Sequence, residues 1–122
     1  MNIQSFGIIA PTSTTTGLPA TNNQLDPAKS YFAQAVSFQA LGTNTGIVYV
    51  CDRVTPNIAT GVGICWEIPV PTGLTIRPAV VVGDPSYVNP LNITGFFILP
   101  TVSGEGVRVT VLRTGSQQIN WP

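Results

Sequence analysis

The sequence predicts an all-β fold built as a single antiparallel β-sandwich, and three observations favour this class. Short apolar runs rich in β-branched and aromatic residues recur along the chain, and their lengths are typical of strands. The chain contains 12 glycines and 11 prolines, which punctuate these runs and mark turns. No long segment shows the apolar spacing of an amphipathic helix.

Six or seven short strands are expected between residues 31 and 113. The runs that predict them are residues 31–33, 35–41, 47–53, 62–70, 74–82, 96–99 and 107–113. The last run alternates most clearly, with Val107, Val109 and Val111 on one face. This spacing of strands fits a jelly-roll-like connection and an immunoglobulin-like one equally well.

The two ends of the chain differ in composition from the middle. We expect residues 1–30 to form an extended N-terminal arm, residues 31–113 the sandwich, and residues 114–122 a C-terminal tail. No charged side chain precedes Asp26, and a Ser/Thr-rich linker at residues 11–19 joins small apolar anchors. Such anchors on a polar linker are typical of a segment that docks on another surface. The residues predicted to bind a partner are Phe6, Ile8, Ile9 and Leu18 of the arm and Trp121 of the tail.

The chain has few charged residues, and they are spread singly along it. Charged residues make up 8% of the sequence, against about 25% in ordinary soluble domains. Five basic and five acidic residues give a net charge of zero. No basic stripe exists to neutralise phosphates, so no nucleic-acid partner is expected. No apolar run approaches the roughly 18 residues of a membrane span, and the N-terminus lacks the pattern of a secretory signal, so we expect no membrane partner and assembly inside a cell.

The run at residues 47–53 and the run at residues 62–70 share the two cysteines of the chain. A hairpin centred near Ile58 would bring Cys51 opposite Cys65. A disulfide and a pair of buried thiols are both compatible with this pairing, and we favour the thiols because assembly in a cell implies reducing conditions. Two cysteines without histidine cannot build a structural zinc site, so no metal or cofactor is expected.

The sequence offers little for catalysis. Without histidine, no His-assisted nucleophile can be assembled within one chain. Asp52 and Glu67 are the best candidates for a carboxylate pair, which a hydrolase would hold roughly 5–10 Å apart. Another alternative is a carbohydrate- or receptor-binding module that presents Trp66 and Tyr87 as a platform. We expect that the protein is not an enzyme, because active sites gather several titratable groups.

Several segments, in their order along the chain, resemble the small virion proteins of tailed bacteriophages. Residues 44–52 resemble an Asn-x-x-x-Val-Tyr-Val-Gly-Asp strand, with Cys51 where that pattern has glycine. The last two segments of that family's pattern are a Phe/Tyr-Ile segment and a hairpin. They correspond here to residues 96–98 and residues 104–109. The similarity covers residues 35–113 and is closest to head decoration (capsid cement) proteins.

The resemblance implies a structural role on a capsid. The expected protein binds the major capsid protein on the outer surface of the virion and staples neighbouring subunits, after assembly in the host cytoplasm. It also implies a homo-oligomer, with a trimer favoured because capsid-surface sites often lie on local three-fold axes. The alternative within the same setting is a tail-attached module that binds a receptor or a carbohydrate.

Overall fold

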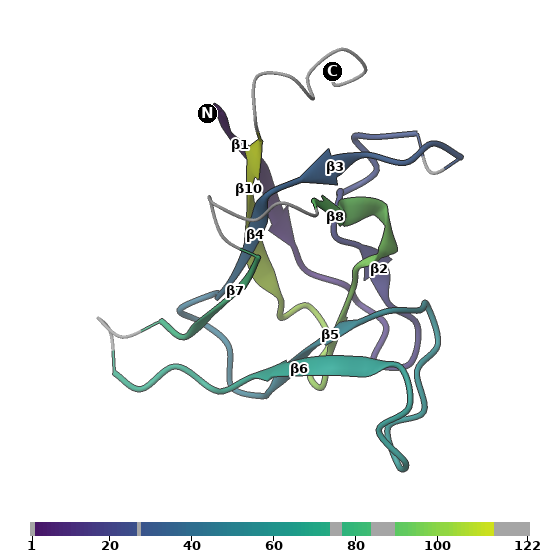
Figure 1. Cartoon of the computed structure of the whole chain (residues 1–122). Coiled ribbons are helices and arrows are strands. Elements are labelled where there is room, and N and C mark those ends of the chain that lie inside the picture. Colours follow the sequence, from purple (N-terminus) through teal and green to yellow (C-terminus); the bar gives the residue numbers. More distant parts are fainter. Residues whose placement is uncertain (1, 27, 74–76, 84–89, 114–122) are drawn as a thin grey trace.

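Two four-stranded antiparallel sheets face each other in the computed structural model of the chain (Figure 1). The structure describes residues 2–26, 28–73, 77–83 and 90–113. In this part of the chain the regular structure is strand apart from one 3-10 turn, η1 (Ile93–Gly95). The predicted all-β sandwich is therefore confirmed.

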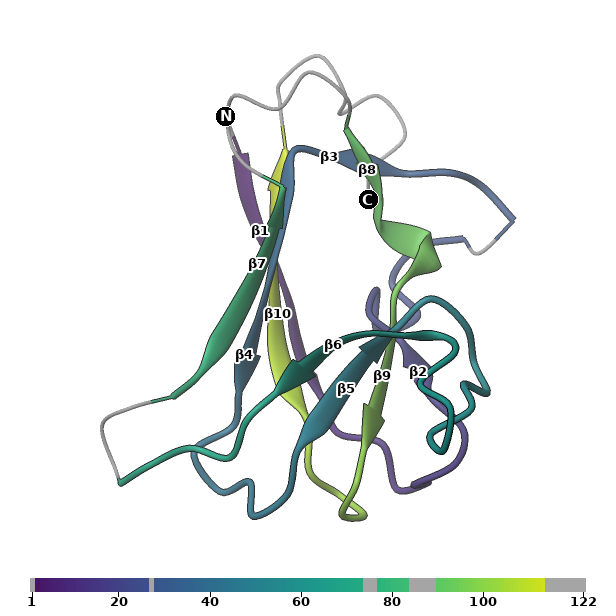
Figure 2. The same ribbon diagram turned by 60° about the horizontal axis from the view of Figure 1, so that its bottom comes forward.

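Each of the two large sheets combines strands from the first and the second half of the chain. Sheet A has the order β1 (Asn2–Ile9), β10 (Val107–Arg113), β4 (Ala35–Ala40) and β7 (Ala79–Gly83). Sheet B has the order β2 (Leu18–Pro19), β9 (Phe97–Pro100), β5 (Val48–Cys51) and β6 (Ile64–Ile68). A third, two-stranded sheet pairs β3 (Phe32–Ala33) with β8 (Leu91–Asn92), at one end of the sandwich and away from β5 and β6 (Figure 2).

The strand pairing is that of a long hairpin rolled into a sandwich. The first strand pairs with the last, β2 with β9, β3 with β8, β4 with β7, and β5 with β6 at the centre. Rolling this ribbon then brings β10 beside β4 and β9 beside β5. Two sheets of four strands connected in this way form a jelly roll, so the topology decides between the two sandwich types that the sequence left open.

The core lies between the sheets and follows the alternation of the strands. Sheet A contributes Val36, Phe38 and Ala40 from β4 and Val107, Val109 and Val111 from β10. Sheet B contributes Val48, Val50, Ile68 and Ile98. Each of these side chains is at most 2% exposed, and the predicted inward face of residues 107–113 is confirmed.

The N-terminal segment differs from the expected arm. Residues 2–9 form β1, which pairs along its length with β10 at the edge of sheet A. A β-bulge inserts Phe6 between Ser5 and Gly7, with Gly7 at a φ of 78° that favours glycine. The bulge turns Phe6 inward, and both Phe6 and Ile9 are 1% exposed in the core. Apolar anchors at residues 6 and 9 therefore complete the sandwich of their own chain.

Candidate functional site

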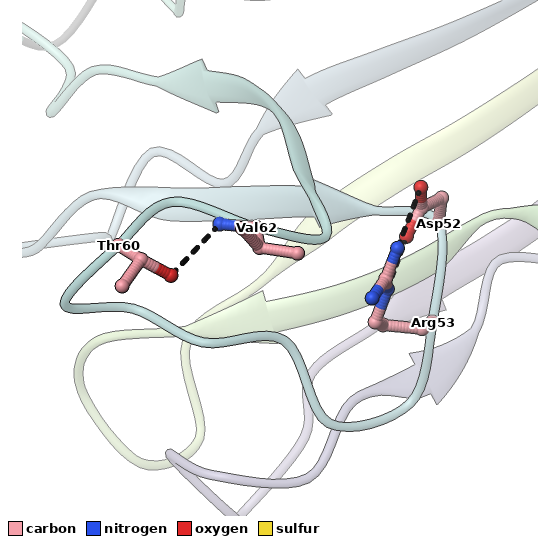
Figure 3. A network of polar contacts seen from close by, with 4 residues as sticks. All are labelled: Asp52, Arg53, Thr60 and Val62. Atoms are coloured by element: carbon pink, nitrogen blue, oxygen red, sulfur yellow. Dashed lines mark hydrogen bonds and ion pairs between the residues drawn. The ribbon is translucent and has the colours of Figure 1, made fainter.

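The structure does not bring Asp52 and Glu67 opposite each other. Glu67 pairs with Tyr49, whereas Asp52 follows the end of β5 three residues later, roughly 10 Å along the strand. The Asp52 carboxylate accepts a hydrogen bond from Nε of Arg53 at 2.7 Å (Figure 3), and this bond lowers the pKa of Asp52. Asp52 and Glu67 therefore do not face each other across the hairpin as expected, and the Asp52 carboxylate is paired with an arginine.

The loop from β5 to β6 makes most of its other polar contacts within the hairpin, and the carbonyl of Val54 accepts a hydrogen bond from the backbone N–H of Gly17 at 2.8 Å. The hydroxyl of Thr60 accepts a hydrogen bond from the backbone N–H of Val62 (Figure 3). The side-chain oxygen of Asn57 accepts one from the backbone N–H of Thr60. These bonds shape the turn of the hairpin and converge on no common point where a substrate would react.

The β5–β6 hairpin is centred on residue 58 as predicted, but a bulge changes the position of the cysteines. Val50 pairs with Trp66, and Cys51 pairs with Ile64, so Cys65 is the extra residue. Both thiols are free; Cys51 is buried and Cys65 is exposed, which corrects the expectation that both are buried. Burial, with smaller contributions from Cys65 and Asp52, raises the pKa of Cys51 to about 11. Cys51 is therefore a packed core thiol with little thiolate character.

Trp66 is exposed, as the binding-module alternative expects, and its ring also packs against the margin of the core. Its ring lies 6.2 Å from that of Phe96, which itself packs against the core cluster and lies 5.6 Å from the ring of Phe38. Trp66 is 37% exposed, so it covers the margin of the core. Tyr87, the other expected member of the platform, lies outside the described residues.

The five residues predicted to bind a partner have different positions. Phe6 and Ile9 are enclosed in the core, whereas Ile8 is 48% exposed on β1 and Leu18 is 43% exposed on β2. Trp121 lies outside the described residues. Of the four that the structure describes, Ile8 and Leu18 are therefore accessible to another molecule.

The strongest candidate for a binding surface is the outer face of sheet A, which turns away from the core. Paired strands place its side chains in three rows: Ile3, Leu112, Ala35 and Gly83; Ser5, Thr110, Ser37 and Val81; and Ile8, Arg108, Gln39 and Ala79. Arg108 is the one charged residue in these rows. Ile3 is 74% exposed and Val81 is 65% exposed, and both lie on edge strands.

Small side chains make the middle of this face concave. Ala35 and Ser37 lie between the larger residues of the edge strands, and a hollow of about 180 Å³ opens there. Aliphatic groups from Ile3, Val81 and Leu112 line it. The outer face of sheet A is therefore a shallow apolar binding surface with aliphatic residues at its margins.

Sequence reasoning missed Ile3, Val81 and Arg108. The alternation in residues 107–113 could have identified Arg108, because it places this residue on the face of the strand that turns away from the core valines. The pairing of β1 with β10 adds Ile3 and Ile8 to the same surface. It joins residues roughly 100 positions apart, so no local sequence pattern indicates it.

The described residues hold no group of three or more cysteine, aspartate or glutamate side chains placed to bind a metal ion. Nor does this part of the chain contain a helix long and apolar enough to cross a membrane. Comparison of the chain with models of known protein families, with curated proteins and with solved structures finds no match.

Proposed function

We propose that this protein is a structural component of a tailed-phage virion, a decoration or cement protein that binds the outer capsid surface and staples neighbouring capsid subunits. The observation that carries the proposal is the outer face of sheet A, where exposed aliphatic side chains surround a hollow and a single residue is charged. Removing such apolar surface from water contributes about 25 cal/mol for each Å², from which the costs of association are subtracted.

Two further observations support this role. The segments at residues 44–52, 96–98 and 104–109 resemble those of head decoration proteins. Jelly rolls are also a common architecture of viral capsid domains, although this is an analogy of fold and many functions share the fold. The proposed action is purely associative and uses no chemical step.

The size of the face suggests how such binding would work. Four strands about 4.8 Å apart and three rows of residues give a projected area of roughly 300 Å². A stable interface buries about 800 Å² on each partner. Contact through this face alone would therefore be weak. Many copies on one shell, further contacts through residues such as Leu18, or a homotrimer on a local three-fold axis would supply the remaining affinity.

Side-chain substitutions test the proposal better than deletion of the N-terminal segment, because deletion would remove β1 from sheet A. Capsids assembled without this protein are mixed with the wild type or with the double variant Ile3→Asp/Val81→Asp, and bound protein is measured by sedimentation. We expect the double variant to lose most of its occupancy, because two carboxylates would have to be buried against the capsid.

Val62→Asp is the matched control for this experiment. Val62 is 54% exposed in the loop between β5 and β6, so its substitution adds a charge of the same kind away from sheet A. We expect this variant to bind as the wild type does. Failure of the folded wild type to sediment with capsids, or equal binding by the double variant, would overturn the proposal.

A further inference from the structure

A second hollow lies at the end of the outer face of sheet A and contains two arginines. Its volume is about 380 Å³, and its lining includes Ile8, Leu41, Gly42, Arg77 and Arg108. Arg108 comes from the third row of sheet A, and Arg77 comes from the segment that leads into β7. Two cationic side chains from distant parts of the sequence thus line one hollow.

The backbone at Gly42 is shaped to accept the guanidinium of Arg77. A Cβ atom added at Gly42 would lie 3.0 Å from Nε and 3.1 Å from Nη2 of Arg77. A larger residue would displace the guanidinium, so the absence of a side chain at Gly42 permits its close approach to the chain. Gly42 thus leaves room for the guanidinium of the exposed Arg77 to lie against the chain.

Neither Arg77 nor Arg108 has a counter-charge within the described residues. The ion pair found there joins Arg53 to Asp52, and the Glu105 carboxylate accepts its hydrogen bonds from Thr45 and Gly46. Two guanidinium groups that line one hollow repel each other, and an anion bound between them would offset this repulsion. An arginine presents several N–H donors in a fork that matches a carboxylate.

We propose that this hollow receives the carboxylate of an aspartate or glutamate side chain from the partner protein. The inference rests on the outer face of sheet A being the association surface. The aliphatic side chains of Ile8 and Leu41 line the same hollow and suit the methylene groups of an acidic side chain. Nucleic acid would require a longer basic track than two arginines on a chain of zero net charge.

The two hollows together define the spacing of the partner's groups. Leu112 lines the apolar hollow and Arg108 lines the arginine hollow, and the two residues are four positions apart on β10. This separation corresponds to roughly 13 Å along a strand. An extended partner segment with an aliphatic side chain at one position and a carboxylate four positions later would occupy both hollows.

A peptide experiment tests the inference without capsids. The probe is a five-residue peptide with leucine first and glutamate last, acetylated and amidated so that one side-chain carboxylate is its sole charge. Binding is followed through the Nε–H resonances of the arginines in ¹⁵N-labelled protein. We expect saturable shifts at Arg77 and Arg108, no shift at Arg53, and at least tenfold weaker binding of the peptide that ends in glutamine.

The variant Arg77→Gln/Arg108→Gln should bind the glutamate peptide at least tenfold more weakly than the wild type, and Arg53→Gln should bind as the wild type does. Equal binding of the glutamate and glutamine peptides would overturn the inference. Tighter binding of inorganic phosphate than of the peptide would also overturn it, because the hollow would then be a site for a free anion.

The capsid assay separates this inference from the proposed function. Loss of binding by Ile3→Asp/Val81→Asp, together with wild-type binding and salt dependence for Arg77→Gln/Arg108→Gln, would refute the arginine hollow and leave the proposed function in place. Failure of the wild type to bind capsids, with the expected peptide shifts, would refute the capsid role and support the carboxylate site on its own.

Discussion

The corner of the molecule formed by residues 41–46 and 101–106 and the outer face of sheet A use their polar groups in opposite ways. In the corner, the buried amide of Asn44 donates to the carbonyl of Gly106 at 2.8 Å and accepts from its N–H at 3.2 Å. The Glu105 carboxylate accepts hydrogen bonds from Thr45 and Gly46. On the outer face and its margin, Arg108 and Arg77 have no such partners among the described residues. Polar groups bonded within the chain maintain the fold, whereas exposed groups that only water solvates are available to another molecule.

Gly106 provides the strongest test that the corner maintains the fold. A Cβ atom at this position would collide with the carbonyl oxygen of Ile9, which belongs to β1. We expect Gly106→Ala to lower the free energy of unfolding by about 3 kcal/mol, because the backbone of β1 would have to move. Urea denaturation measures the change.

Gly95→Ala is the matched control, since a Cβ there meets no atom within 4 Å. It should change stability by less than about 0.5 kcal/mol. Equal stability of the two variants would contradict the tight packing of the corner against β1.

Substitution of Asn44 should cause the next largest loss of stability. Asn44→Ala leaves the N–H and the carbonyl of Gly106 without their buried partners, and we expect a loss of about 2 kcal/mol in urea denaturation. Asn57→Ala removes one hydrogen bond in the exposed loop between β5 and β6 and should cost less than half as much. Similar losses in both variants would show that burial of the corner is not what makes Asn44 important.

Glu105 should make stability depend on pH. Desolvation raises the pKa of its carboxyl, but hydrogen bonds from Gly46 and Thr45 together outweigh it and hold the pKa below its usual value. A lowered pKa in the folded state means that this stabilisation is complete above the unfolded pKa of about 4.3 and is lost as pH falls through the folded pKa. Glu105→Gln should therefore cost about 1 kcal/mol at pH 7, where water screens part of the interaction, and progressively less in acid.

Unfolding by urea at pH 7 and at pH 3 measures this difference. Glu67→Gln is the control, because the side chain of Glu67 is exposed and makes no hydrogen bond to the described residues. A loss of stability in Glu105→Gln that is the same at both pH values would assign the effect to packing and not to the charge of the carboxylate.

Regular strands could be predicted from the sequence, whereas their bulges could not. Residues 107–113 alternate without interruption, so both the strand and its inward face could be derived from Val107, Val109 and Val111. The hairpin about residue 58 was also derivable. Its bulge was not, because one extra residue at Cys65 changes the pairing of Cys51 without any change in composition.

The N-terminal strand was missed for a similar physical reason. Its inward residues Phe6 and Ile9 are three positions apart, which breaks the period of two that identifies a strand. The bulge at Phe6 accounts for this spacing, and glycine at position 7 permits it. Amides of Asn22 and Gln24 then donate to the carbonyl of Phe6, a contact between segments that no local pattern reports. The outer face of sheet A depends on this strand, so most of the candidate site could not be derived either.

The smallest expected effect on stability lies on the outer face itself. Arg77→Gln and Arg108→Gln should each change the free energy of unfolding by less than about 0.5 kcal/mol, because neither side chain has a partner to lose within the described residues. At low salt the double variant should be slightly more stable than the wild type, since it removes repulsion between two guanidinium groups. Thermal unfolding in 20 mM and 500 mM salt measures this difference. A clear loss of stability in either single variant would place that arginine with Glu105 among the groups that maintain the fold and would weaken the contrast between the two regions.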